Sequence, residues 1–148
     1  MKWVTRARPK TDRIACPWLI RRFIDPDADI VYVPSDQVLA FVAEHGAIGF
    51  DSPGTRYDHR DGMCTFEVLV DEYHLDDDQA LVRLAKIVHA ADISSEIHTD
   101  PFAPALLALA SGGLDVEADD QELLARAGFV YDALYAWCQR ETAQGVAT

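Results

Sequence analysis

Long apolar runs, a secretion signal and paired cysteines are all missing from this sequence of 148 residues. Its longest uncharged apolar run, around residues 102–114, is shorter than the roughly 20 residues that a membrane-spanning helix needs. The N-terminus lacks the apolar core and the small-residue cleavage site of a signal peptide. Three widely spaced cysteines without a CxxC pair exclude a disulfide framework and fit reduced thiols. We therefore expect a soluble, cytoplasmic protein that makes no contact with a membrane.

Basic residues are also scarce. The chain has 13 lysines and arginines against 25 acidic residues, and this net charge of -12 argues against direct nucleic-acid binding. Seven of the 13 basic residues lie in the first 22 positions, which together carry +6, while the remaining 126 residues carry -18. This basic segment either pairs with the acidic excess or binds a small anion, and the sequence leaves both interpretations open. The arginines that would bind such an anion are Arg6, Arg8, Arg13, Arg21 and Arg22.

The apolar patterning predicts an α+β fold in a single domain, residues 1–148. Residues 1–54 are predicted to form a small βαβαβ layer, with strands at about 3–7, 30–33 and 47–51 and helices at about 13–24 and 35–45. Asp12 is expected to cap the first helix, with Pro17 in about its first turn, where a missing N–H group costs little.

Residues 55–141 are predicted to be mainly helical, and residues 142–148 to form a frayed tail. Thr65 is expected to cap the first of these helices, which is followed by helices at about 79–91 and 119–140. Between those two, Pro101 and Pro104 introduce a helix that is expected to break at Gly112 and Gly113.

Histidines and acidic residues are the main candidates for chemistry, because the sequence has neither a glycine-rich phosphate loop nor a GxSxG element. His59 and Glu67 lie close together in sequence, and His89 and Asp92 are three residues apart on one helix face. Two imidazoles with one or two carboxylates are a ligand set that Zn²⁺, Fe²⁺ or Mn²⁺ accepts. The alternative is that His59 is a solvated loop residue and His89 a hydrogen-bonded, half-buried one.

The cysteines have more than one interpretation. Cys64 is a metal ligand, a reactive thiol or a small buried side chain, and its place before a helix favours the thiolate. Cys16, near the start of the first helix, has the same alternatives, and both are candidate catalytic residues. Cys138 lies on the apolar face of the last helix and is predicted to belong to the core.

The run WVTRARPKTDRIACPWLIRRFIDP, residues 3–26, resembles the start of the ChrB C-terminal domain of bacterial chromate-resistance proteins. Later segments match in the expected order, at residues 58–67, 87–92 and 131–135, so that the resemblance covers nearly the whole chain. It implies a link to chromate-responsive regulation. It also favours the metal site, because all four predicted ligands, His59, Glu67, His89 and Asp92, lie within matching segments.

Our leading hypothesis is a cytoplasmic metal-binding protein of chromate or oxidative-stress resistance. The divalent metal would act on a small anionic ligand or substrate as a Lewis acid or one-electron centre, with Cys64 or Cys16 as redox partner. The alternative is a non-catalytic module that senses chromate, a tetrahedral oxyanion, through the arginines. A homodimer is a third hypothesis, because Tyr131, Tyr135 and Trp137 are many aromatic residues for one exposed helix.

Overall fold

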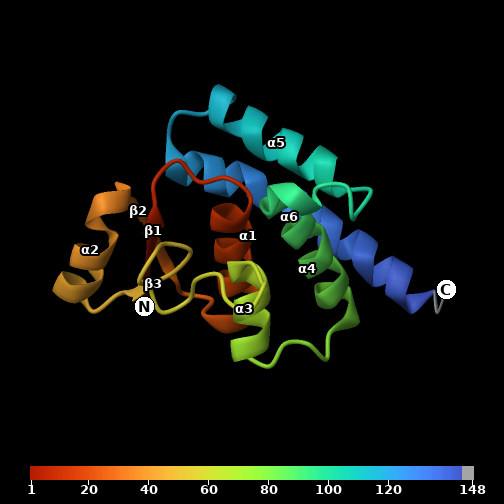
Figure 1. The fold of residues 1–148 in the computed structure, drawn as a ribbon, viewed down its shortest axis with the longest axis horizontal. Coiled ribbons are helices and arrows are strands. Elements are labelled where there is room, and N and C mark those ends of the chain that lie inside the picture. The colour runs from red at the N-terminus through yellow and green to blue at the C-terminus, as the bar shows by residue number, and fades with distance from the viewer. Residues whose placement is uncertain (145–148) are drawn as a thin grey trace.

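The computed structural model describes residues 1–144 and confirms the α+β fold, with a small parallel sheet followed by helices (Figure 1). The strands are β1 (Lys2–Arg6), β2 (Asp29–Val33) and β3 (Ile48–Gly49). The α-helices are α1 (Asp12–Leu19), α2 (Val38–His45), α3 (Thr65–Glu72), α4 (Gln79–Asp92), α5 (Ala103–Val116) and α6 (Asp120–Ala143). Each expected helix and strand is present, with shifted ends.

The sheet has β1 at its centre, paired in parallel with β2 and with β3. Neighbouring residues of β1 point to opposite faces, as the pleat of a strand requires. Trp3 packs into the large core shared with the helical part of the chain, whereas Val4 packs with Val38 and Ala47 beneath α2. Helix α2 therefore covers one face of the sheet, and α1 with the remaining helices lies on the other (Figure 1).

Helix α1 contains a proline in its interior, beyond the expected first turn. A proline has no N–H group, so the carbonyl oxygen four residues earlier loses its helical donor. Here that oxygen belongs to Arg13, and the hydroxyl of Tyr32 on β2 donates to it at 2.7 Å. The helical segment then continues as a π-helical turn, Ile20–Ile24, up to the predicted end.

Helix α5 does not break at Gly112 and Gly113, contrary to our prediction, but continues to Val116. Gly113 has no side chain, which allows Leu123 of α6 to pack closely against α5. A β-carbon at Gly113 would lie only 3.2 Å from Cδ1 of Leu123. The end of α5 is closed by Arg8, whose guanidinium donates to the carbonyl oxygens of Leu114, Glu117 and Ala118 at 2.7–2.9 Å.

The aromatic residues of α6 are mostly internal. Tyr131 and Tyr135 are buried in the core, and Trp137 is half-buried against Phe102. The observation that suggested a homodimer surface is therefore explained by core packing, and the dimer stays an untested prediction. Helix α6 extends to Ala143, past the predicted start of the frayed tail, and residues 145–148 of that tail lie outside the described residues. No helix within residues 1–144 is long and apolar enough to cross a membrane.

Candidate functional site

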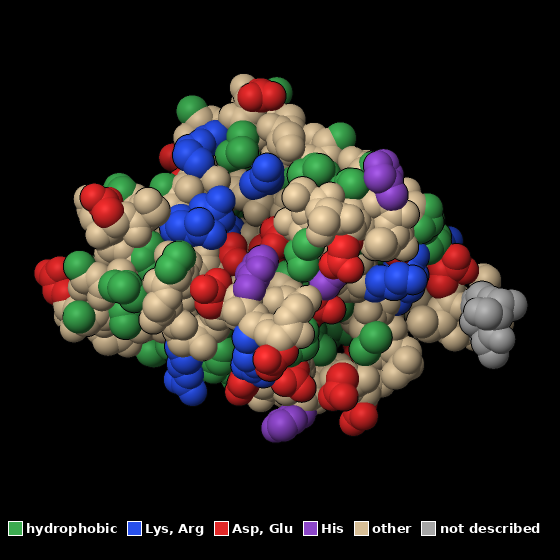
Figure 2. Space-filling model, viewed as in Figure 1, with side chains coloured by type: hydrophobic (Ala, Val, Ile, Leu, Met, Phe, Trp, Pro, Cys, Tyr) green, Lys and Arg blue, Asp and Glu red, His purple; other side chains and the backbone are tan. Residues whose placement is uncertain are grey.

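Polar side chains gather on both sides of the first turn of α3. Near the middle of the face in Figure 2, acidic, basic and histidine side chains meet in one area. They form two clusters. The His89 cluster consists of Cys64, Glu67, His89 and Glu96. The His59 cluster consists of Asp12, Asp51, His59 and Asp92.

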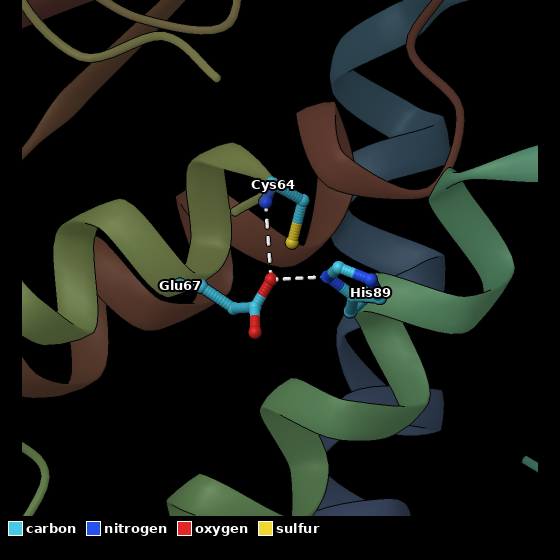
Figure 3. Close-up of side chains that lie close together, drawn as sticks. All are labelled: Cys64, Glu67 and His89. Atoms are coloured by element: carbon cyan, nitrogen blue, oxygen red, sulfur yellow. Dashed lines mark hydrogen bonds and ion pairs between the residues drawn. The ribbon is translucent and has the colours of Figure 1, made fainter. Parts of the chain in front are cut away.

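The His89 cluster is built from the start of α3, the last turns of α4 and the turn that follows α4. Cys64 is the N-cap of α3, and its backbone N–H donates to Oε1 of Glu67 at 3.0 Å. The same Oε1 lies 2.5 Å from Nδ1 of His89, as Figure 3 shows. One ligand atom each of Cys64, Glu67 and His89 lies within 4.8 Å of the other two. The arrangement therefore places a thiol, a carboxylate and an imidazole around one point.

The other nitrogen of His89 also faces a carboxylate. Its Nε2 is paired with Oε2 of Glu96, which follows α4 in the 3-10 turn Ser94–Glu96. Burial lowers the pKa of His89. The hydrogen bonds to Glu67 and Glu96, together with the charges of these two residues, outweigh burial, so the net shift of the pKa is upward. A neutral imidazole has one N–H group and can donate to only one of these two carboxylates. A doubly protonated ring, or a cation bound through one nitrogen, would satisfy both contacts.

A pocket of about 360 Å³ opens beside Glu67 and His89. Its walls are partly apolar, with Met63, Val70 and Val82, and they also carry charged residues. These are Asp71, Asp76 and Lys86. A small ligand in the pocket would thus lie next to the His89 cluster.

The cysteines do not have the properties of exposed, reactive thiols. Burial and the nearby Asp12 carboxylate raise the pKa of Cys64 far above its ordinary value, and the same two causes raise the pKa of Cys16. Cys16 is buried and donates its S–H to Asp12 at 3.3 Å. Burial beside negative charge opposes the thiolate that the position of Cys64 before α3 favours. A bound metal ion would be needed to deprotonate the thiol.

The His59 cluster lies where the chain leaves the carboxyl ends of β1 and β3. Nε2 of His59 faces Asp92 at 3.1 Å, Asp51 at 3.3 Å and Asp12 at 3.4 Å. Asp12 was predicted to cap its own helix, but the N-cap of α1 is Thr11. The Asp12 carboxylate instead accepts the backbone N–H groups of Thr65 and Phe66 at 2.8 and 3.0 Å. Asp12 thereby holds the first turn of α3, whose N-cap is Cys64 and not the predicted Thr65.

Charge is concentrated in the His59 cluster. The hydrogen bond to Asp12, with the charges of the other two carboxylates, raises the pKa of His59 to about 9. Burial and the charge of Asp12 raise the pKa of Asp51 to about 7 and that of Asp92 to about 6. The carboxylates thus repel one another, and a positive charge on His59 relieves part of that repulsion.

Comparison with known proteins assigns the chain to a family. The family model described as "ChrB, C-terminal domain" matches residues 3–138. The chain belongs to the ChrB C-terminal domain family. It is 35% identical over 136 residues to Protein ChrB of Cupriavidus metallidurans, a match that covers 90% of this chain and 40% of that protein. The chain thus spans less than half the length of this curated relative. No solved structure matches it.

In this ChrB C-terminal domain the four predicted metal ligands fall into two clusters and not one. Glu67 and His89 meet in the His89 cluster, and His59 and Asp92 meet in the His59 cluster. His89 and Asp92 share a face of α4, as predicted, but each contacts a different group. The first turn of α3 lies between the clusters, because Asp12 binds its backbone on one side and Glu67 projects from it on the other.

The five arginines of this ChrB C-terminal domain do not form one patch. Arg8 closes the end of α5 and pairs with Asp120, while Arg22 pairs with Asp132 and stacks on Trp18 and Tyr135. Arg21 donates to the carbonyl oxygen of Ala28. The remaining two, Arg6 and Arg13, lie together beside the His59 cluster, each 3.7 Å from Oδ2 of Asp51.

Three residues of the ChrB C-terminal domain clusters were missed from sequence. Asp12 looks like an ordinary N-cap, and nothing near Glu96 marks it as a partner of His89. Asp51 carried a usable signal, because it follows the last strand of a parallel layer, and ligands gather at the carboxyl ends of such strands.

Proposed function

We propose that this chain serves chromate resistance by binding a divalent metal ion at the His89 cluster. Membership of the ChrB C-terminal domain family supports the role in chromate resistance. The proposal for the metal rests on the geometry of the cluster and on the chemistry of its donors.

The observation that carries the proposal is the pair of carboxylates on the ring of His89. In protein metal sites, a ligating histidine binds the metal through one nitrogen and donates its other N–H to a carboxylate or carbonyl oxygen. His89 has this arrangement if Nδ1 is the ligand, because Glu96 then accepts from Nε2. Glu67 and Cys64 supply an oxygen and a sulfur at the same point.

The donor set favours Zn²⁺, with Fe²⁺ as the next choice, because a thiolate and an imidazole suit these ions better than they suit Mg²⁺ or Ca²⁺. Three protein ligands leave one position of a tetrahedral site open. The adjacent pocket, lined by Glu67 and His89 themselves, gives a small ligand access to that position. In chemical terms the bound ion would act as a Lewis acid toward that ligand.

Elemental analysis of the untagged protein tests the proposal, with the variant Glu96→Gln as the mechanistic check. We expect about one metal ion per chain, and about 10- to 100-fold weaker Zn²⁺ binding in Glu96→Gln, because the amide no longer orients the imidazole as a carboxylate does. Competition with a chelator of known affinity gives both dissociation constants. Glu44→Gln, an exposed position on α2, should bind as the wild type does. A protein that arrives metal-free and does not take up added Zn²⁺ would contradict the proposal.

A second candidate function is oxyanion sensing, favoured by the position of Arg6 and Arg13. Both guanidinium groups lie near Asp51 without a close ion pair, and Arg13 is anchored by bonds of 3.1 Å to the carbonyl oxygens of Arg6 and Ala7. They therefore retain N–H groups for a small anion beside the imidazole of His59.

Under this second candidate, Arg13→Lys is expected to weaken oxyanion binding by about tenfold or more. A lysine presents a point charge without the paired donors of a guanidinium, and a lost charge-assisted bond costs roughly 1.5–3 kcal/mol. Calorimetric titration with chromate, sulfate and phosphate at low salt measures the loss. Arg8→Lys serves as the control, because Arg8 is engaged at the end of α5. The sensing function is ruled out if none of the three anions binds below millimolar concentration.

A further inference from the structure

We infer that the His59 cluster is a second divalent-cation site, separate from the metal centre at His89 and selective for harder ions. This inference goes beyond the proposed function and does not depend on it, because the two clusters share no ligand. Its ligands would be Nε2 of His59 and one carboxylate oxygen each of Asp12 and Asp92, which lie within 4.8 Å of one another, with Asp51 next to the same nitrogen.

The convergence on one point is the first argument. Three carboxylate oxygens from three different parts of the chain lie 3.1–3.4 Å from a single imidazole nitrogen. That nitrogen can offer only one proton, so it cannot form a good hydrogen bond with all three. A divalent ion among Nε2 of His59 and the oxygens of Asp12 and Asp92 could bind all three at once.

The carboxylates are held in place before any ion binds. The Asp12 carboxylate is fixed by the amides of Thr65 and Phe66, and Oδ1 of Asp51 accepts the hydroxyl of Thr65 at 2.8 Å. Asp92 is the last residue of α4, where the negative end of the helix dipole disfavours a carboxylate. Without a cation, the repulsion among these carboxylates lowers the stability of the fold. A bound cation would relieve this repulsion, and the relief would contribute to the affinity for the cation.

An entry path also exists. The carboxylate side chains are 0%, 7% and 17% exposed for Asp12, Asp51 and Asp92, whereas the imidazole of His59, which contacts all three, is 44% exposed. His59 comes from a loop that is tied to α3 by Arg60, which pairs with Asp71 and Glu72. An ion would reach the carboxylates by rotation of one exposed side chain, without movement of the core.

The two clusters differ in the ions that they prefer. The His89 cluster contains a thiol, which selects Zn²⁺. The His59 cluster offers one nitrogen with the oxygens of Asp12 and Asp92, and a further oxygen of Asp51 beside them, a set that suits Mn²⁺, Fe²⁺ or Mg²⁺. Mn²⁺ is the most useful probe, because its sharp paramagnetic-resonance signal in water broadens when it binds to protein. The two sites can therefore be measured in the same sample.

The experiment is a titration of metal-free protein with Mn²⁺ in the presence of one equivalent of Zn²⁺. We expect the wild type to bind one Mn²⁺. Asp92→Asn, a change of the same size at a half-buried position, should weaken Mn²⁺ binding at least about tenfold and leave the Zn²⁺ content unchanged. His59→Gln should have the same effect. Asp77→Asn, on an exposed turn, is the matched control and should bind both ions as the wild type does.

Several results would overturn the inference. These are no Mn²⁺ binding by the wild type, equal Mn²⁺ affinity in Asp92→Asn and the wild type, or loss of Mn²⁺ binding in His89→Ala titrated without Zn²⁺. The outcome for the metal centre at His89 is read separately from the Zn²⁺ content. Mn²⁺ binding without Zn²⁺ binding would support the second site and count against the proposed function.

Discussion

Replacement of His89 by alanine is expected to lower the affinity for Zn²⁺ by a factor of about 100 or more, because it removes the nitrogen ligand and leaves Glu67 and Cys64 alone. His89 is only partly buried on α4, and alanine favours helices, so the fold should persist. Circular dichroism would show nearly unchanged helicity, while elemental analysis and chelator competition would show the loss of metal.

His98→Ala is a matched control for this experiment, because His98 is an exposed histidine two residues from Glu96. It should retain the wild-type metal content. A His89→Ala protein that still holds one Zn²⁺ per chain with unchanged affinity would show that the His89 cluster is not the metal centre.

Asp12→Ala is expected to destabilise the fold by about 3–5 kcal/mol, a large part of the 5–15 kcal/mol of a typical domain. The change leaves the amides of Thr65 and Phe66 without an acceptor in the protein interior, and it removes a carboxylate from His59. Asp12→Asn should recover little, because its NH₂ group faces an N–H donor. The midpoint of urea unfolding measures the change.

The control for Asp12 is Asp36→Ala, at an exposed position before α2, which should change stability by less than about 0.5 kcal/mol. If Asp12→Ala unfolds at the same urea concentration as the wild type, the bonds from its carboxylate to α3 contribute nothing to stability. The account of how α3 is held would then be wrong.

Much of the fold could be predicted from sequence because its determinants are local. A run of β-branched and aromatic residues that ends at a proline marks β2, and apolar residues at helical spacing mark α4 and α6. The errors occurred where a contact from a residue distant in sequence, and not the local sequence, determines where a helix ends. Gly112 and Gly113 read as a helix end, but Arg8 closes α5 further along and Leu123 packs against Gly113.

The site was predicted in part, since the pairing of residues depends on the tertiary structure. Helical spacing places His89 and Asp92 on one face, about 4.5 Å apart along the axis of α4. Helical spacing does not reveal that the first turn of α3 separates the group that contacts His89 from the group that contacts Asp92. Neither could spacing assign Asp12 to α3, because the residues that it joins are more than 50 positions apart.

One oxygen atom in the structure has two roles. Oε1 of Glu67 accepts the backbone N–H of Cys64, which closes the start of α3, and it also contacts His89. Under the proposed function, selection for folding and selection for metal binding therefore act on the same atom. A descendant that had lost the metal centre would still be under pressure to keep Glu67, whereas His89 and Glu96 would be free to drift. Among relatives of this chain, the retention of His89 with Glu96 is thus a better genetic marker of the proposed metal centre than the retention of Glu67.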